Sequence, residues 1–242
     1  MCVSLFGMDT LRESVRHLLQ AVRREEWTYH RALTGEQRAS DLRELVAKAS
    51  AARRYATSML REVGAGRGVD GCVEPEVGPV GDWAAVHHDA HEAMTGLHAA
   101  LDPMTEDQLA ADAGPKRSHP QYLWRDVTNL AVRGPFLSYS QWHREQGREV
   151  EAVAVLARWY EAVRGEMGLP TKALSDVSYD LACGLAKAGR LDEAMVYLPD
   201  AFTYNDRGAV GVLKAWARED ADLAPLSGRA DFQALVGGPA RT

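Results

Sequence analysis

The chain has 242 residues, which is enough for one large domain or two small ones. Apolar residues make up 46% and charged residues 26% of the sequence, as is ordinary for a globular protein. The formal net charge is −6, and nucleic-acid binding in general requires a basic face that neutralises phosphates. We therefore expect no nucleic-acid partner.

Cysteine usage and the first residues both indicate a cytoplasmic protein. The three cysteines, Cys2, Cys72 and Cys183, are far apart and form no CxxC pair, which fits a reducing compartment. The opening "MCVSLFGMD" is apolar but reaches Asp9 too soon for a signal peptide or a membrane span. We expect a cytoplasmic location and no contact with a membrane.

The first half of the chain has the periodicity of four helices, over residues 10–33, 41–63, 83–101 and 120–133. The expected start signals are Thr10 with Glu13, Ser40, Asp82, the "TEDQ" box at 105–108, and Pro120 as a first helical residue. Nothing there alternates like a strand. The pattern predicts an all-α fold that opens with an up-down four-helix bundle over residues 1–135.

Two features of this half are interpreted as solvent-facing. Arginine and lysine residues recur along 41–63, with Glu44 and Glu62 among them, which is typical of a solvated helix face; the basic residues are Arg43, Lys48, Arg53, Arg54 and Arg61. The segment 64–82 is dense in glycine and proline, and it follows a helix with no GK[ST] after it. It is expected to be a flexible linker rather than a phosphate loop.

The second half contains an internal repeat. "GREVEAVAVL" at 147–156 matches "GRLDEAMVYL" at 189–198 with a period of 42 residues. Each copy lies between two expected helices, 136–146 with 148–165 and 174–188 with 191–203, and a closing helix is expected within 215–237. Gly147 and Gly189 are expected to end the first helix of each pair, and Ala152 and Ala194 allow close approach of the second.

This half, residues 136–242, resembles the tetratricopeptide repeat. The second copy has residues at the signature spacings of that family: Leu181, Ala182, Leu185, Gly189, Ala194, Leu198 and Ala201. The first copy keeps Gly147, Ala152 and Leu156, but Ser140 and Trp159 stand at positions that are usually small. The resemblance implies stacked helical hairpins whose surface binds a protein partner.

The first half resembles DinB-like four-helix bundles of the ClbS/DfsB branch. The resemblance rests on "EEWTYHRALTGEQRASDLRELVAKASAARRYATSMLRE" at 25–62 and on "LWRDVTNL" in the last helix. Such proteins often bind a divalent metal through one histidine on the second helix and a pair on the last. This chain has no histidine around Lys48 and only His119 near the last helix, so the metal triad is absent. The branch hydrolyses reactive small-ring metabolites in self-protection, which the resemblance implies as an alternative function.

The stretch "WAAVHHDAHEAMTGLH" at 83–98 holds four of the eight histidines of the chain. On a helix, His87 and His91 are four residues apart and can share a divalent metal, whereas His98 lies about 10 Å further along the axis. A third ligand would have to come from another helix; the candidates are His30, Glu26 and Asp126. The competing interpretation is a histidine-rich boundary between core and solvent with no metal, and we expect no required cofactor.

Two groups of residues are candidates for ligand binding. The first would line a cavity in the bundle: Trp27, His30, Tyr55, His87, His91 and Trp124. The second lies around an expected helix break at Gly134-Pro135, where the two halves should meet: Trp124, Asn129, Arg133, Tyr139 and Trp142, with His143. Core packing is the competing interpretation of the aromatic residues. No GxSxG elbow or Cys–His arrangement identifies a catalytic residue.

Two functions follow from these patterns. The first is an accessory protein that binds a protein partner through its helical repeats, in a setting such as specialised metabolism. The alternative is a ClbS-like protein that hydrolyses or sequesters a small molecule in a cavity of the bundle. The first predicts a stable protein complex, and the second predicts a sizeable cavity with converging polar groups.

Overall fold

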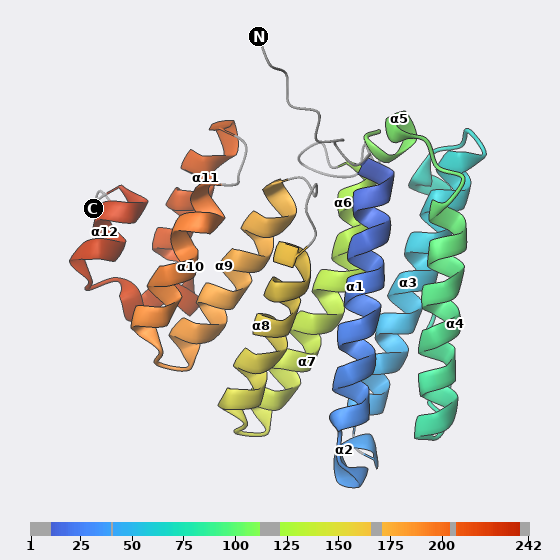
Figure 1. Cartoon of the computed structure of the whole chain (residues 1–242), viewed down its shortest axis with the longest axis horizontal. Helices are drawn as coiled ribbons and strands as arrows, with labels where there is room; N and C mark the ends of the chain where they lie inside the picture. The colour runs from blue at the N-terminus through green and yellow to red at the C-terminus, as the bar shows by residue number, and fades with distance from the viewer. Residues whose placement is uncertain (1–10, 40, 112–121, 166–170, 204–206, 238–242) are drawn as a thin grey trace. The chain divides into compact units, whose positions relative to one another are not determined.

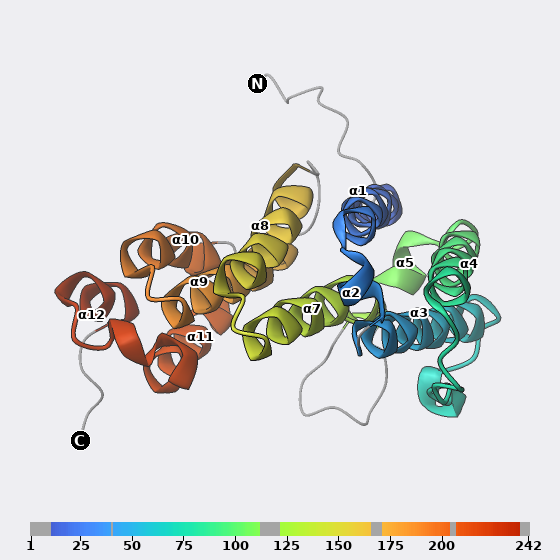
Figure 2. The same cartoon turned by 90° about the horizontal axis from the view of Figure 1, so that it is seen from below.

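The structure is a computed structural model of the whole chain, and it describes residues 11–39, 41–111, 122–165, 171–203 and 207–237. All regular secondary structure within these ranges is helical, so the expected all-α class is confirmed (Figures 1 and 2). The chain divides into two compact units: unit 1 is Met1–Pro135 with Gly165–Leu169, and unit 2 is Phe136–Arg164 with Pro170–Thr242. Each unit is described by itself below.

Unit 1 is built mainly from three long helices and one interrupted helix. Its elements are α1 (Leu11–Ala32), α2 (Gly35–Ala39), α3 (Leu42–Gly64), η1 (Val69–Gly71), α4 (Trp83–Leu101), α5 (Glu106–Leu109), α6 (Leu123–Thr128) and η2 (Asn129–Arg133). The bounds of α4 are those that the sequence predicts. Apolar residues at three- and four-residue steps on α1 are buried, which gives the helix one face in the core; they are Val15, Leu18, Leu19 and Val22.

Side-chain caps fix where several of these helices begin. Asp82 accepts a hydrogen bond from the backbone N–H of Ala85 at 2.9 Å and caps α4 as expected. The box at 105–108 is also confirmed, because Thr105 and Gln108 bond reciprocally at the start of α5. The starts expected at Thr10, Ser40 and Pro120 lie outside the described residues.

Helices α3 and α4 run in the same direction, side by side (Figure 1). At one end, Arg43 near the start of α3 donates to the carbonyl of Gly81, just before α4. At the other end, Gln108, just beyond α4, donates to the carbonyl of Val63 near the end of α3. The up-down order expected from the sequence is therefore wrong for this pair, because an up-down order makes consecutive helices antiparallel.

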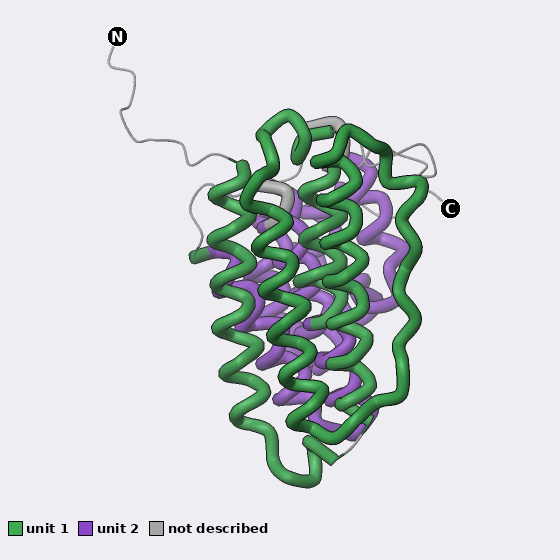
Figure 3. The backbone as a smooth tube through the Cα atoms, turned by 90° about the vertical axis from the view of Figure 1, so that its right-hand side faces the viewer, with its two compact units in different colours: residues 1–135, 165–169 green, residues 136–164, 170–242 purple. Residues whose placement is uncertain are grey.

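The connection between α3 and α4 explains their parallel course. Residues 72–82 have no regular secondary structure and are extended at both ends, at Cys72 and Asp82; eleven extended residues span about 36 Å. A helix of 23 residues, such as α3, is about 35 Å long. The connection therefore returns the chain to the end at which α3 begins, and Figure 3 shows it as an extended tube along the outside of unit 1. The segment is longer than a turn needs to be because it crosses the whole unit.

The helix that follows Leu123 does not break at Gly134-Pro135. The π-helical turn η2 follows α6 directly, and α7 (Gly134–Glu145) follows η2 without a non-helical residue between them. In η2 the N–H of Gly134 donates to the carbonyl of Asn129, five residues earlier. The wider turn accommodates Pro135, which has no N–H to donate to the carbonyl of Ala131 four residues before it. At the expected break, the chain therefore changes from a π-helical turn to an α-helix and stays helical.

Unit 2 contains two helical hairpins with the same connection geometry. The first is α7 with α8 (Glu149–Gly165), and the second is α9 (Thr171–Lys187) with α10 (Leu191–Thr203), which pack together. Gly147 and Gly189 have φ of 71° and 73°, in the left-handed region. The residue after each glycine donates its N–H to the carbonyl five residues earlier. This is the helix ending expected at both glycines, repeated at a period of 42 residues.

The rest of unit 2 is α11 (Arg207–Glu219), η3 (Ala221–Leu226) and α12 (Ala230–Val236). The expected closing segment is therefore divided between three short elements. Ala152 and Ala194 are fully buried in the first turn of α8 and α10, where small side chains are expected. No helix in the described part of the chain is both long and apolar enough to span a bilayer.

Candidate functional site

The centre of unit 1 is a buried ion pair. Arg53 of α3 is fully buried, and its Nη2 lies 2.8 Å from Oε2 of Glu26 on α1. The same guanidinium donates from Nε and Nη2, both at 3.2 Å, to the carbonyl of Ala131 in η2. That carbonyl is the one that Pro135 leaves without a helical donor. One side chain thus joins α1, α3 and η2.

The sequence interpretation of Arg53 as part of a solvated face is wrong. Arg53 lies four residues after Ala49 and three before Ala56, on the buried stripe of α3. Glu26 likewise continues the stripe of α1, four residues after Val22. Opposite charges on two apolar stripes are a signal of a buried pair, because buried charges require a partner. Arg54 and Lys48, in contrast, are exposed as expected.

Four of the predicted cavity residues do lie together, between α1 and α4. The ring of His87 lies 4.3 Å from that of Trp27 and 5.5 Å from that of His30, centroid to centroid. His91 stands 6.2 Å from Trp27, and Trp83 stacks at 5.9 Å on His87. Trp27 is 40% exposed, so the cluster opens to solvent at that side chain while His30 is buried.

Burial sets the charge state of the histidines in this cluster. Desolvation lowers the pKa of His30 from 6.5 to about 4, and the nearby carboxylate of Glu26 opposes this shift only in part. Desolvation also lowers the pKa of His87, which is only partly buried. Both imidazoles are therefore mainly neutral at pH 7.

The described residues do not complete a metal site at His87 and His91. They contain no group of three His, Cys, Asp or Glu side chains placed to hold a metal ion, although Glu26, His30 and Asp126 are among them. The guanidinium of Arg23 lies 3.0 Å from Nδ1 and 3.1 Å from Nε2 of His91. A fixed positive charge at this distance disfavours a divalent cation on the same imidazole. A boundary between core and solvent is the interpretation that this geometry favours.

The space enclosed by this cluster is small. A cavity of about 20 Å³ lies between Arg23, Glu26, Trp27, His30, His87, Ala90, His91 and Met94. That volume holds about one water molecule. Tyr55, half-buried on α3, and Trp124, buried on α6, are not among its lining residues. The sizeable cavity on which the small-molecule alternative depends is not found at the residues predicted to line it.

The residues predicted around Gly134-Pro135 are divided between the units. Asn129 and Arg133 are half-buried in η2 of unit 1. Tyr139 and Trp142 are buried in unit 2, where Trp142 packs 4.8 Å from the ring of His143 and under the guanidinium of Arg148. Their packing within unit 2 matches the core interpretation, and a ligand site at the junction stays a prediction.

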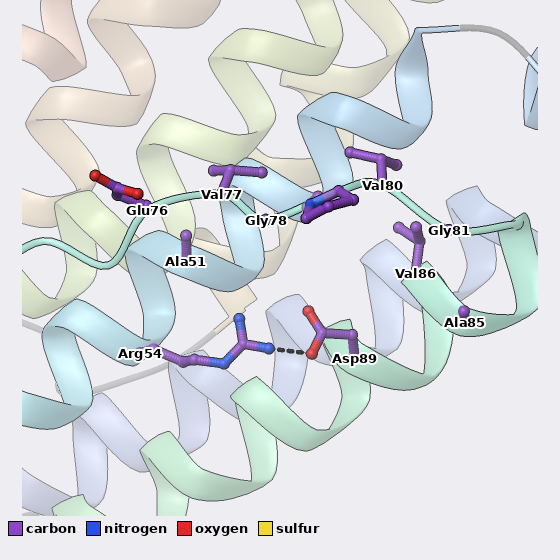
Figure 4. A pocket seen from close by; sticks show the side chains of 12 residues that line it. Ala51, Arg54, Glu76, Val77, Gly78, Val80, Gly81, Ala85, Val86 and Asp89 are labelled. Carbon is purple, nitrogen blue, oxygen red and sulfur yellow. Dashed lines mark hydrogen bonds and ion pairs between the residues drawn. The ribbon is translucent and has the colours of Figure 1, made fainter.

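A larger groove lies beside residues 76–81, a segment expected from its glycine and proline content to be only a linker. The extended segment 76–81 crosses over α3 and α4, and about 370 Å³ of space lies beneath it (Figure 4). Arg54 and Asp89 form an ion pair across this groove. The remaining lining residues are small or apolar; they are Ala47, Ala51, Val77, Gly78, Pro79, Val80, Gly81, Ala85 and Val86, together with Glu76. Ala47 and Ala51 are the sequence signal that could have indicated this groove. They lie four residues apart on one face of α3, and their short side chains leave space beneath the segment that crosses them.

Unit 2 presents an ordered aromatic side chain at its surface. Trp216 of α11 is 58% exposed, and its ring stacks on that of Tyr179 of α9 at 5.8 Å and 15°. The hydroxyl of Tyr179 donates to Oδ2 of Asp220 at 2.8 Å, and burial raises the pKa of this phenol above its ordinary value. Val212, one turn before Trp216, is 70% exposed. Neither Val212 nor Trp216 was among the site residues predicted from the sequence.

Comparison with known proteins adds no assignment. The chain matches no known protein family, no curated protein and no solved structure.

Proposed function

We propose that the protein is an accessory protein that binds a protein partner through unit 2. The observation that carries this proposal is the exposed pair Val212 and Trp216 on one face of α11. Residues four apart on a helix lie side by side, so the two side chains make one apolar contact surface. Both side chains are more than half exposed, and tryptophan is among the residues that contribute most to protein interfaces.

The support behind Trp216 favours a binding role over incidental exposure. Its indole stacks on Tyr179, whose hydroxyl is fixed by Asp220. Asp220 is itself held, because its Oδ1 accepts the backbone N–H of Asp222 at 2.9 Å. A side chain that is ordered before binding loses less entropy when a partner covers it. Trp216 is therefore suited to be the anchor of an interface.

The finer fold assignments support the same role as proposals. The helix ending shared by Gly147 and Gly189 at a period of 42 residues supports a tetratricopeptide-like arrangement for unit 2. Helical-hairpin repeats characteristically bind proteins along an extended surface. For unit 1 we keep the DinB-like bundle as a proposal that rests on the sequence pattern alone.

A small-molecule hydrolase or sequestering protein of the ClbS kind remains the weaker proposal. It requires a cavity at the histidine cluster, and the space there fits about one water molecule. No nucleophile, base and oxyanion donor converge among the described residues of that cluster.

The proposal is tested by comparing interactors of the full chain with those of the Val212→Ala/Trp216→Ala double variant. We expect a partner that the wild type retains under gentle lysis and that the double variant loses. Val73→Ala is the matched control, because Val73 is an exposed valine of unit 1. The partner is then purified, and its Kd is measured by calorimetry with all three proteins.

For a tryptophan anchor, truncation is expected to weaken the Kd by about thirtyfold or more, since such residues contribute at least about 2 kcal/mol. The control variant is expected to bind as the wild type does. A partner that binds the double variant and the wild type with equal Kd would show that α11 is not the binding surface.

A further inference from the structure

The groove beneath residues 76–81 has the form of a small-molecule site in unit 1. Its floor is made by Ala47 and Ala51 of α3 and by Ala85 and Val86 of α4. Because these side chains are short, the extended segment above them leaves about 370 Å³ open. This lies at the lower end of the volumes of ligand sites in proteins, and it is far larger than the space at the histidine cluster.

The charges around the groove are unequal. One arginine, Arg54, and two carboxylates, Glu76 and Asp89, line it. Arg54 pairs with Asp89, and Figure 4 shows this pair facing the extended segment. Glu76 forms no ion pair within the described part of the chain. The net charge of the lining is thus −1, which favours a ligand with one positive charge.

The backbone of the extended segment offers further acceptors. Among the described residues, no hydrogen bond joins the backbone of residues 73–80 to another part of the protein. The carbonyl of Gly81 accepts from Arg43, which anchors the segment at the end nearest α4. Peptide carbonyls and carboxylates both accept hydrogen bonds from an ammonium group, which has donors and no acceptor.

We propose that this groove binds a small molecule with a compact apolar body and one protonated amine. The ammonium group lies at Glu76, the lining carboxylate that Arg54 does not pair with, where it balances the net charge of the lining. The apolar body lies on Ala51, Val80 and Val86. This site is separate from the surface of unit 2 proposed to bind a partner, and its residues are not shared with that surface.

Three probes that share one chain length test the charge preference: n-hexylamine, hexan-1-ol and hexanoate. Each is titrated into the full-length protein at pH 7 and followed by saturation-transfer NMR and thermal unfolding. We expect hexylamine to bind at least about tenfold more tightly than the other two, as charge-assisted hydrogen bonds imply. Hexanoate binding as tightly as hexylamine, or no binding by hexylamine, would overturn the proposal.

Variants locate the site and reverse its preference. Glu76→Gln/Asp89→Asn changes the lining from −1 to +1, so we expect hexanoate to bind it more tightly than hexylamine. Ala47→Leu fills the groove and is expected to abolish binding of hexylamine without changing the unfolding temperature of the free protein by more than a few degrees. Glu92→Gln is the matched control, an exposed carboxylate of α4 that does not line the groove.

Two results with these variants would contradict the site. In one, Ala47→Leu binds hexylamine as the wild type does. In the other, Glu92→Gln weakens binding as much as Glu76→Gln/Asp89→Asn does, which would indicate a general surface attraction. Neither result bears on α11, and loss of the partner after Trp216→Ala would not bear on the groove.

Discussion

Unit 1 and unit 2 differ in the buried polar contacts that join their helices. In unit 1 the buried pair is charged: Arg53 of α3 meets Glu26 of α1 and the carbonyl of Ala131. In unit 2, two buried neutral hydroxyls join the helices of the hairpins: Ser140 donates to the carbonyl of Ala152 at 2.9 Å, and Ser175 to that of Ala201 at 2.6 Å.

The two kinds of buried contact differ in the free energy that it costs to form and to break them. A buried charge pair is costly to dehydrate and very costly to break, so it selects one arrangement of distant segments. A hydroxyl on a backbone carbonyl costs little to form or to lose, and it joins neighbouring helices. Unit 1, with its long connection and its π turn, depends on a specific long-range contact. Unit 2 repeats a local hairpin, and its contacts are mostly between neighbours.

The sharpest test of this comparison is Arg53→Met. The change removes the guanidinium that pairs with the buried carboxylate of Glu26, and it removes both donors from the carbonyl of Ala131. We expect the free energy of unfolding of the full chain to fall by about 3–5 kcal/mol, measured by urea denaturation with circular dichroism. The control Arg54→Met removes an exposed ion pair and is expected to cost less than about 1 kcal/mol.

Adding Glu26→Leu to Arg53→Met should restore much of that loss, because neither charge of this pair then remains buried. A loss below about 1 kcal/mol for Arg53→Met alone would show that the charged core does not determine the stability of unit 1.

The next largest effect is a loss of stability in acid, which we expect to be caused by protonation of His30. Its pKa is lowered from 6.5 to about 4 in the folded protein, mainly by desolvation. Below pH 6.5 the unfolded chain binds the proton more readily, so stability is full above pH 6.5 and falls as the pH approaches 4. The groups that face His30 are Glu26, His87, Arg53 and Arg38.

Between pH 7 and pH 4.5, we therefore expect the free energy of unfolding of His30→Gln to fall by about 2 kcal/mol less than that of the wild type. The measurement is urea denaturation at several pH values. His88→Gln, an exposed histidine on α4, should follow the wild-type profile. If the free energies of unfolding of His30→Gln and the wild type changed with pH in the same way, His30 would not be a buried, neutral imidazole.

A smaller effect is expected at the repeated hairpin endings of unit 2. Gly147→Ala and Gly189→Ala should each cost about 1 kcal/mol, because the backbone there is left-handed while no neighbour lies within 4 Å of the added Cβ. The two losses should be equal if the endings are equivalent. Gly68→Ala is the control, since Gly68 is extended and also has open space. Unequal losses at Gly147 and Gly189 would argue against a structural repeat.

The smallest effect is expected at the neutral hydroxyls. Ser140→Ala and Ser175→Ala should each reduce the free energy of unfolding by about 1 kcal/mol or less, as for a single neutral hydrogen bond. Thermal unfolding followed by calorimetry measures both, with Ser227→Ala as an exposed control. A loss near that of Arg53→Met would remove the distinction between the two units.

Features set by neighbouring residues were predictable from the sequence. The bounds of α4 follow from Asp82 as a cap and an apolar stripe, and the hairpin endings follow from Gly147 and Gly189. These signals act within one helical turn, so they do not depend on how the rest of the chain is arranged.

Features set by distant residues were missed. The interpretation of Arg53 as solvated failed because its partner Glu26 lies on another helix, and a helix read alone does not show what faces it. The segment 76–81, which covers the groove, was predicted to be only a linker. Glycine and proline indicate irregular backbone, but they do not indicate which helices that backbone crosses. The direction of α4 depends on the length of that segment, which is long enough to recross the unit.

The parallel course of α3 and α4 also aligns two helix dipoles. Peptide dipoles give each helix a positive amino end and a negative carboxyl end, so side-by-side parallel helices repel at both ends. Acidic side chains stand at the shared amino end, Glu44 in the first turn of α3 and Asp82 at the cap of α4. Arg61 lies in the last turn of α3, at the shared carboxyl end. Each of these charges offsets about 0.3–1 kcal/mol of the repulsion. Arg43 and Glu62 lie at the same two ends of α3 and act in the opposite sense, so the helix ends offset only part of the electrostatic cost of the long crossover.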